Sequence, residues 1–204
     1  MGQHFTGVKI TSDFSDYYDY LSNDGSSIVY DRKEKDRQSR GKDLAFLRSL
    51  GIRTIEIKQP KDWIGSGEQL VVYKNPKLHH GEGKIITSID DALLMYGNYP
   101  ATLLLKPDDG LTCKYLQLGK RRFTMYFQSK EPLKIGELIS INETSLQFNE
   151  SIKFPIFSID YLMVGGQMLA TDFNTVENLK EIGLDKYLKP EEVLIEIERY
   201  FREV

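Results

Sequence analysis

The sequence predicts an α/β (α+β) protein, in which a small parallel α/β lobe at the N-terminus packs on an antiparallel-sheet lobe at the C-terminus. Two observations support this prediction. In the first half, short β-type runs alternate with helical runs, the order that favours a parallel sheet. In the second half, strand-like runs follow one another with only turn residues between them, which is typical of an antiparallel sheet. We therefore expect two lobes, residues 1–98 and residues 99–204, that pack as one unit.

The elements of the N-terminal lobe follow from apolar periodicity and from residues that begin or end helices. Ile55 and Ile57 alternate with polar neighbours, as in a half-buried strand, and Gly51 is a suitable helix end. Ser88 is a suitable N-cap for a short helix that follows it. The lobe is expected to contain strands at residues 8–10, 27–30, 53–58 and 69–73, and helices at residues 13–21, 42–50 and 89–96.

The C-terminal lobe is expected to be a sheet followed by one helix. Turn signals such as Gly165-Gly166 separate its strand-like runs. Pro190 suits the first turn of a final helix, and Glu191 and Glu192 suit its positive end. The expected strands are residues 102–106, 115–118, 122–128, 138–141, 157–164 and 168–172.

Composition and charge exclude several classes of protein. The 204 residues include 27 Lys and Arg against 30 Asp and Glu, and the net charge of −3 argues against a dedicated nucleic-acid coat or a polybasic membrane anchor. The single cysteine, Cys113, allows neither an internal disulfide nor a Cys-based zinc site. No stretch approaches the roughly 20 apolar residues of a membrane helix, and the first residues lack the apolar core of a signal peptide. We expect a cytoplasmic protein, from a bacterium or a phage-infected cell, without a membrane partner.

Two acids and an amide are expected to meet on one face of a hairpin. A turn at Gly165-Gly166 places Asp160 beside Asp172 on the neighbouring strand, with Cβ atoms roughly 5 Å apart. Asn174 follows Asp172 by two residues, so the two side chains share a face. Oxygen ligands of this kind suit Mg²⁺, which would relieve the repulsion between the carboxylates. The alternative is a pair of exposed acids at strand ends, with Asn174 capping the following turn.

The order acid, turn, acid-x-Asn resembles the ATP-grasp family. The resemblance covers roughly residues 99–204 and includes a following stretch, residues 175–198, that looks like the family's closing loop and last helix. It implies that Asp160, Asp172 and Asn174 hold the magnesium ions that bridge the phosphates of ATP. The function implied is an ATP-dependent carboxylate–amine (or carboxylate–thiol) ligase.

The same resemblance implies basic residues around the phosphates. Either Lys58, ahead of residues 65–67, or Lys106 would contact the α- and β-phosphates. Arg121 and Arg122 lie in a strand similar to one in which the family points a basic residue at the phosphates, where they would stabilise the transferred phosphoryl group. ATP and Mg²⁺ are the cofactors implied, and the partners implied are a nucleotide and a small-molecule or peptide substrate.

Two other functions stay open. Residues 11–19 look similar to uncharacterised proteins of tailed phages and their hosts, and the Glu of the family's adenine hinge is not evident near residues 103–107. These features fit a non-enzymatic, phage-type binding protein that engages a host protein or a nucleotide signal. Five Lys and Arg residues between Arg32 and Arg40 could contact nucleic acid, a reading that the net charge of −3 disfavours.

Overall fold

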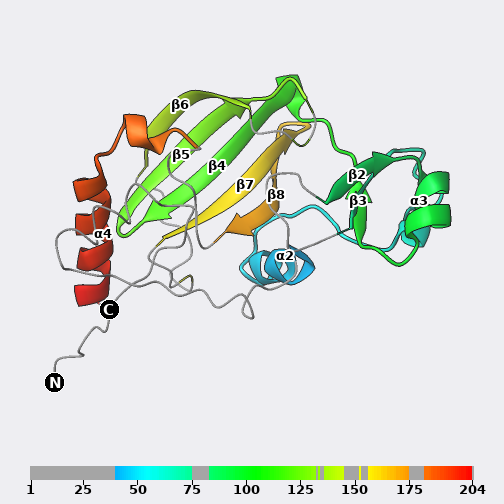
Figure 1. Cartoon of the computed structure of the whole chain (residues 1–204), viewed down its shortest axis with the longest axis horizontal. Helices are drawn as coiled ribbons and strands as arrows, with labels where there is room; N and C mark the ends of the chain where they lie inside the picture. Colours follow the sequence, from blue (N-terminus) through cyan, green and yellow to red (C-terminus); the bar gives the residue numbers. More distant parts are fainter. Residues whose placement is uncertain are drawn as a thin grey trace.

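The computed structural model describes residues 40–74, 83–131, 133, 136–144, 152, 156–174 and 182–203. The strands expected at residues 8–10 and 27–30, and the helix expected at residues 13–21, lie outside the described residues. The described chain forms two antiparallel sheets and three α-helices, which confirms the α/β (α+β) class (Figure 1).

The larger sheet has five strands, and all of them come from the second half of the chain. Its order is β6–β5–β4–β7–β8, and every neighbouring pair is antiparallel, as the sequence predicts. Consecutive strands pair readily because tight turns join β4 to β5 and β7 to β8. The strands are β4 (Leu111–Leu118), β5 (Arg121–Gln128), β6 (Glu137–Glu143), β7 (Ile156–Val164) and β8 (Gln167–Asn174).

The smaller sheet corrects one expectation. Its three strands, in the order β2–β1–β3, pair antiparallel, whereas the sequence predicts a parallel sheet in this half of the chain. The connection from β1 to β2, residues 74–83, is shorter than the dozen or more residues that a parallel crossover needs. The strands are β1 (Leu70–Tyr73), β2 (Lys84–Thr87) and β3 (Ala101–Leu103).

The three helices begin and end near their expected residues. Helix α2 spans Arg40–Ser49, and Gly51 follows it with a φ of 81°. Helix α3 spans Ile89–Tyr96, and the Ser88 hydroxyl accepts the Asp91 N–H at 3.1 Å, as expected of an N-cap. Helix α4 spans Pro190–Glu203 and confirms the predicted final helix. No helix among the described residues combines the length and the apolar character needed to cross a membrane.

Alternation along the strands gives the larger sheet two apolar faces. One face packs against α2, where Leu44 and Leu47 are buried with Phe157 and Ile159. The other face packs against α4, where Val193 and Ile197 are buried with a second set of strand residues. That set consists of Leu116, Leu118, Phe123, Met125, Phe127 and Ile156. The larger sheet is therefore the middle layer of the molecule, between two helices.

The segment at residues 53–58 joins the two sheets instead of forming a strand of its own. Thr54 makes a parallel bridge to Ala170 of β8, and Lys58 makes an antiparallel bridge to Ala101 of β3. This segment therefore runs from the edge of the larger sheet to the edge of the smaller one. Figure 1 shows the smaller sheet and α3 beyond β8, at the opposite end of the molecule from α4. The expected division at residue 98 stays a prediction, and β3, just after it, belongs to the smaller sheet.

Candidate functional site

Asp160 and Asp172 lie directly opposite each other on β7 and β8. The two-residue turn at Gly165-Gly166 pairs Val164 with Gln167, a register that by itself would place Thr171 opposite Asp160. The ladder shifts by one residue after Asp160, so that Asp172 takes this place. The bulge is thus what brings the two carboxylates to neighbouring positions on one face.

Arg40, the first residue of α2, holds the Asp172 carboxylate. Its Nη2 lies 2.7 Å from Asp172 Oδ2, and its Nη1 donates to the carbonyl oxygen of Thr171 at 2.8 Å. The guanidinium also stacks over the ring of Tyr73 in β1, with 5.3 Å between the guanidinium carbon and the ring centroid. Only 10% of the Arg40 side chain and 19% of the Asp172 side chain are exposed. Arg40 therefore connects α2, the edge of the larger sheet and the smaller sheet at one point.

Lys114 holds the other carboxylate. It lies opposite Asp160 on the central strand β4, and its Nζ is 2.6 Å from Asp160 Oδ1 and 3.4 Å from the hydroxyl of Ser158. Lys114 is buried, while 35% of the Asp160 side chain is exposed. An ammonium in the middle of a sheet loses hydration, and the ion pair with Asp160 offsets part of that cost.

Lys84, at the start of β2, brings a third cation to the carboxylates. Burial lowers the pKa of Lys84, and the neighbouring charge of Arg40 lowers it further, while Asp172 and Asp160 act in the opposite direction. Burial raises the pKa of Tyr73 to about 12, so that its hydroxyl stays protonated at neutral pH. The smaller sheet thus contributes a cation and a phenol to a site whose carboxylates come from the larger sheet.

The pKa values of Asp172 and Arg40 reflect competition between burial and neighbouring charges. Burial raises the pKa of Asp172, and Asp160 adds to the rise, whereas Arg40, Lys84 and Lys114 oppose it. Burial acts to lower the pKa of Arg40, but the charges of Asp172, Tyr73 and Asp160 and the hydrogen bond to Asp172 raise it overall. The three cations therefore favour the ionised form of Asp172, against the effect of burial.

The donor set fits a hard divalent cation. Asp160, Asp172 and Asn174 share one face, and Asn174 lies opposite Ser158, next to the carboxylate pair along the ladder. Asp160 Oδ1 is buried, and apart from the Lys114 ammonium no described residue donates to it. Within the described residues no three Asp, Glu, His or Cys side chains gather as metal ligands, so the third ligand would be the Asn174 amide oxygen. Oxygen ligands in this small number suit Mg²⁺, which completes its shell with water and phosphate oxygens.

Comparison with solved structures identifies the fold. The ATP-grasp ligase PsnB, solved with a precursor peptide and AMPPNP, matches with a TM-score of 0.54 at 8% identity, over 89% of this chain and 66% of that chain. D-alanine–D-alanine ligase from Bacillus anthracis, solved with ATP, matches with a TM-score of 0.52 at 12% identity, over 93% of this chain and 74% of that chain. The chain has an ATP-grasp fold. The likeness at these identities concerns the fold alone, and no protein-family model and no curated protein matches the sequence.

A third similar structure is the macrocyclase MdnC from Microcystis aeruginosa, solved with its precursor peptide MdnA. It matches with a TM-score of 0.50 at 14% identity, over 79% of this chain and 62% of that chain. The chain therefore spans between 62% and 74% of the lengths of these three structures.

The lysines expected at the phosphates of an ATP-grasp site, Lys58 and Lys106, are both exposed. Lys58 is exposed, pairs with Glu56 and lies over the ring of Trp63, with 4.8 Å from its Nζ to the ring centroid. Lys106 is exposed between β3 and the short helix η4 (Asp108–Gly110). No described ion pair or hydrogen bond joins either lysine to Asp160 or Asp172. Their assignment to the phosphates stays a prediction.

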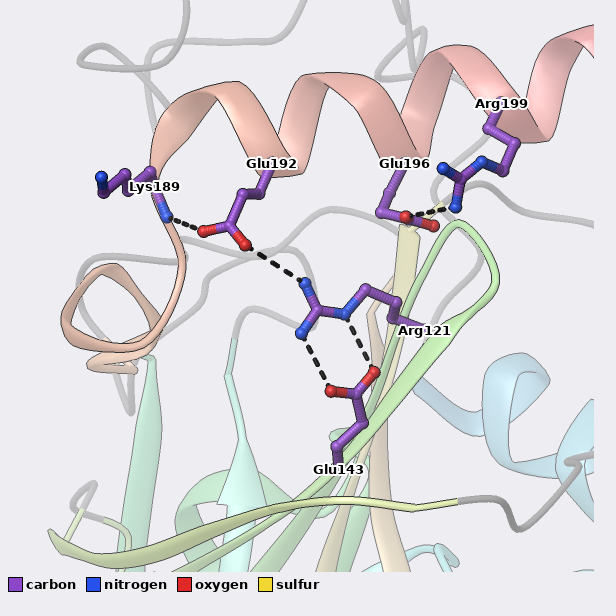
Figure 2. A network of polar contacts seen from close by, with 6 residues as sticks. All are labelled: Arg121, Glu143, Lys189, Glu192, Glu196 and Arg199. Carbon is purple, nitrogen blue, oxygen red and sulfur yellow. Dashed lines mark hydrogen bonds and ion pairs between the residues drawn. The ribbon is translucent and has the colours of Figure 1, made fainter.

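Arg121 lies at the start of β5, between Glu143 and Glu192 of helix α4 (Figure 2). It faces Leu118, four residues along β4 from Lys114, which is about 13 Å at the rise of an antiparallel strand. Its Nε and Nη2 donate to Glu143 of β6 at 2.9 Å each, and its Nη1 lies 3.7 Å from Glu192 of α4. Three carboxylate oxygens therefore surround this guanidinium.

Arg122 lies beside Arg121 and points to the opposite face of the sheet. Its partner across the ladder is Gln117, and its Nε is buried without a hydrogen bond to a described residue. The roles of Arg121 and Arg122 in catalysis stay predictions.

Sequence reasoning missed Lys84 and Lys114, and it considered Arg40 only as part of a basic loop. Lys114 had a usable signal, because it is a charged residue in an otherwise apolar run with Cys113, Tyr115 and Leu116. Pairing β4 with β7 would have placed it opposite Asp160. Lys84 had no such signal, because its position depends on how the two sheets pack.

Proposed function

We propose that this chain binds ATP with Mg²⁺ at Asp160, Asp172 and Asn174, and that it acts as an ATP-dependent ligase for a carboxylate. The observation that carries the proposal is the cross-strand pair of Asp160 and Asp172, with Asn174 on the same face and three cations around it, in an ATP-grasp fold. Carboxylates and cations gathered at one point suit a metal-bound polyphosphate, which needs both.

Each group in the site would have a separate task. Asp160, Asp172 and Asn174 would hold the metal, which supplies charge neutralisation at the β- and γ-phosphates. Lys84 and Lys114, from the smaller and the larger sheet, would direct their ammonium groups at phosphate oxygens and stabilise the charge that develops during transfer. Tyr73 would remain a protonated phenol, able to donate a hydrogen bond.

The reaction that suits this arrangement has two steps. A substrate carboxylate oxygen attacks the γ-phosphorus of ATP, the bond to the bridging oxygen breaks, and ADP leaves. An amine then attacks the carbonyl carbon of the acyl phosphate, and inorganic phosphate leaves as the amine loses a proton. The solved neighbours PsnB and MdnC were determined with precursor peptides, which supports a peptide as one candidate substrate.

Titration calorimetry with ATP, in the presence and absence of Mg²⁺, tests this proposal. We expect Mg²⁺-dependent binding by the wild type and at least about a tenfold loss of affinity in Asp172→Asn, because loss of a supporting group alone weakens metal sites by roughly 10–100-fold. Asp185→Asn, at an exposed position in the short helix η5 (Leu184–Lys186), is the matched control and should bind as the wild type does.

The outcomes separate the candidate functions. If Asp172→Asn keeps the Mg²⁺-dependent affinity for ATP of the wild type, the metal does not bind at this hairpin. Magnesium-dependent binding of ATP without formation of ADP, when mixtures of carboxylates and amines are present, would favour a non-enzymatic nucleotide-binding protein instead of a ligase.

A further inference from the structure

Arg40 forms an ion pair with Asp172, the carboxylate that a metal would need as a ligand. Its Nη2 lies 2.7 Å from Asp172 Oδ2, and its Nη1 is held by the Thr171 carbonyl oxygen at 2.8 Å. Arg40 begins α2, where the helix dipole disfavours a cation. A positive charge at this end of a helix, nine-tenths buried, needs an anion beside it, and Asp172 is that anion.

The charges around the pair do not favour a bare cation. Among the described residues, the three cations Arg40, Lys84 and Lys114 lie around the two carboxylates Asp160 and Asp172. A divalent cation alone would add positive charge beside these three cations in a partly buried setting. A polyphosphate brings negative charge with the metal and offsets it.

Arg40 also has a donor that its protein partners leave open. The Arg40 Nε is buried, and no described residue accepts a hydrogen bond from it. A guanidinium presents its donors in a planar fork that matches phosphate oxygens. The same side chain can therefore exchange a carboxylate for a phosphate without leaving the site.

We infer, on the basis of the proposed function, that Arg40 excludes a bare divalent cation from Asp172 and releases this carboxylate only to a metal that arrives with a polyphosphate. In the absence of ligand, the guanidinium holds Asp172 and Thr171. In the presence of a metal–polyphosphate, the phosphate oxygens accept hydrogen bonds from the Arg40 guanidinium, and the Asp172 carboxylate binds the metal. Arg40 is thus a specificity-determining residue, which makes metal binding depend on the anion.

Binding of Mn²⁺, followed by electron paramagnetic resonance, tests this inference without any turnover. The wild-type chain of 204 residues is titrated with Mn²⁺ alone and with Mn²⁺ plus inorganic triphosphate, alongside Arg40→Gln. Arg48→Gln is the matched control, because Arg48 lies exposed on the same helix and its Nε donates only to the Leu44 carbonyl oxygen in the described contacts.

We expect the wild type and Arg48→Gln to bind Mn²⁺ at least tenfold more tightly with triphosphate than without it. Arg40→Gln should bind Mn²⁺ alone at least tenfold more tightly than the wild type does, because Asp172 is then free for the metal. Equal affinity of the wild type for Mn²⁺ with and without triphosphate, or no gain in Arg40→Gln, would overturn the inference.

A second variant covers the case in which Arg40→Gln does not fold. Arg40→Lys keeps the charge but cannot reach Asp172 and the Thr171 carbonyl oxygen together with a planar fork. It should also tighten binding of Mn²⁺ alone, and wild-type affinity in this variant would contradict the inference. If folded wild type binds neither the metal nor the metal–triphosphate, the proposed function fails as well, whereas Mg²⁺–ATP binding without a gain in either variant rejects the role of Arg40 alone.

Discussion

At the scale of single residues, Asp172 shows how a buried carboxylate can be kept ready for a cation. Burial and the neighbouring Asp160 raise its pKa, and Arg40 acts against both. Removing the guanidinium would leave a carboxylate that is costly to ionise unless another cation replaces it. A metal is such a cation, and this competition is the physical reason for the proposed exchange at Arg40.

Gly119 shows a second constraint at this scale, because α4 approaches the β4–β5 turn at this residue. Gly119 has a φ of 57°, and a Cβ there would overlap the carbonyl oxygen of Glu196 in α4. Gly165, in the β7–β8 turn, has the same φ of 57° but open space around its Cβ position. A substitution at Gly165 therefore tests backbone strain alone, whereas a substitution at Gly119 tests backbone strain and close packing together.

We predict that Gly119→Ala destabilises the protein more than Gly165→Ala does. Both substitutions should cost about 1 kcal/mol for the left-handed backbone, and Gly119→Ala should cost roughly 1–3 kcal/mol more for the overlap with α4. Urea unfolding of both variants measures the difference in the free energy of unfolding. Equal losses would show that α4 does not rest on this turn.

At the scale of elements, polar contacts hold the β7–β8 turn and helix α4 in place on the larger sheet. Asp108, in η4, accepts the N–H groups of Gly165 and Gly166 at 3.0 and 2.9 Å, and these hydrogen bonds lower its pKa. The β7–β8 turn is thus tied to the segment that precedes β4. This contact supports the hairpin on which Asp160 and Asp172 are paired.

Arg121 joins β5 to β6 and to α4 in a similar way (Figure 2). Its hydrogen bonds lower the pKa of Glu143. Because the folded pKa lies below the ordinary value for Glu, about 4.3, this contact adds stability above that pH. The contribution is lost as the pH falls through the folded pKa.

We predict that the wild type and Glu143→Gln differ in stability at pH 7 and converge in acid. The difference in the free energy of unfolding should be about 0.5 kcal/mol at pH 7, since Glu143 is half exposed, and should shrink as the pH falls below the ordinary value for Glu, about 4.3. Urea unfolding over a series of pH values measures it. Glu137→Gln, at the other end of β6, is the control, and a difference that persists or grows in acid would contradict the prediction.

At the scale of the whole molecule, the described contacts between the two sheets include one extended segment and the side chain of Arg40. Residues 53–58 bridge β8 and β3, and Arg40 connects α2 with Asp172 and Tyr73. The proposed ligand would lie between carboxylates on the larger sheet and Lys84 on the smaller one. Binding should therefore stabilise the relative placement of the two sheets as well as the site.

We predict that Mg²⁺ with ATP raises the melting temperature of the wild type by about 5–10 °C at a ligand concentration near 100 times Kd. Such an excess adds about 2.7 kcal/mol, and each kcal/mol is worth roughly 2–4 °C in a chain of this size. Scanning calorimetry measures the shift. Mg²⁺ alone, or ATP with a chelator, should give a smaller rise, and an equal rise with the chelator would show that the metal takes no part in binding.

Local features of the sequence were sufficient for the hairpin and for the helix ends. The glycine pair at residues 165–166 sets the turn, and the pairing of Asp160 with Asp172 follows from it to within the one-residue bulge. Ser88 and Pro190 mark the starts of α3 and α4 for reasons that involve only their own neighbours. Sequence-local chemistry of this kind is available without knowledge of the fold.

Only the tertiary structure decided which cations reach the carboxylates and how the smaller sheet is paired. Arg40 comes from helix α2, Lys84 from the smaller sheet and Lys114 from the larger sheet, and their charges meet because residues 53–58 bring the sheet edges together. A lysine in a strand looks the same in the sequence whether it faces solvent or a buried acid. Charge and burial at a point are set by long-range packing, whereas register, caps and turns are set by residues close in the chain.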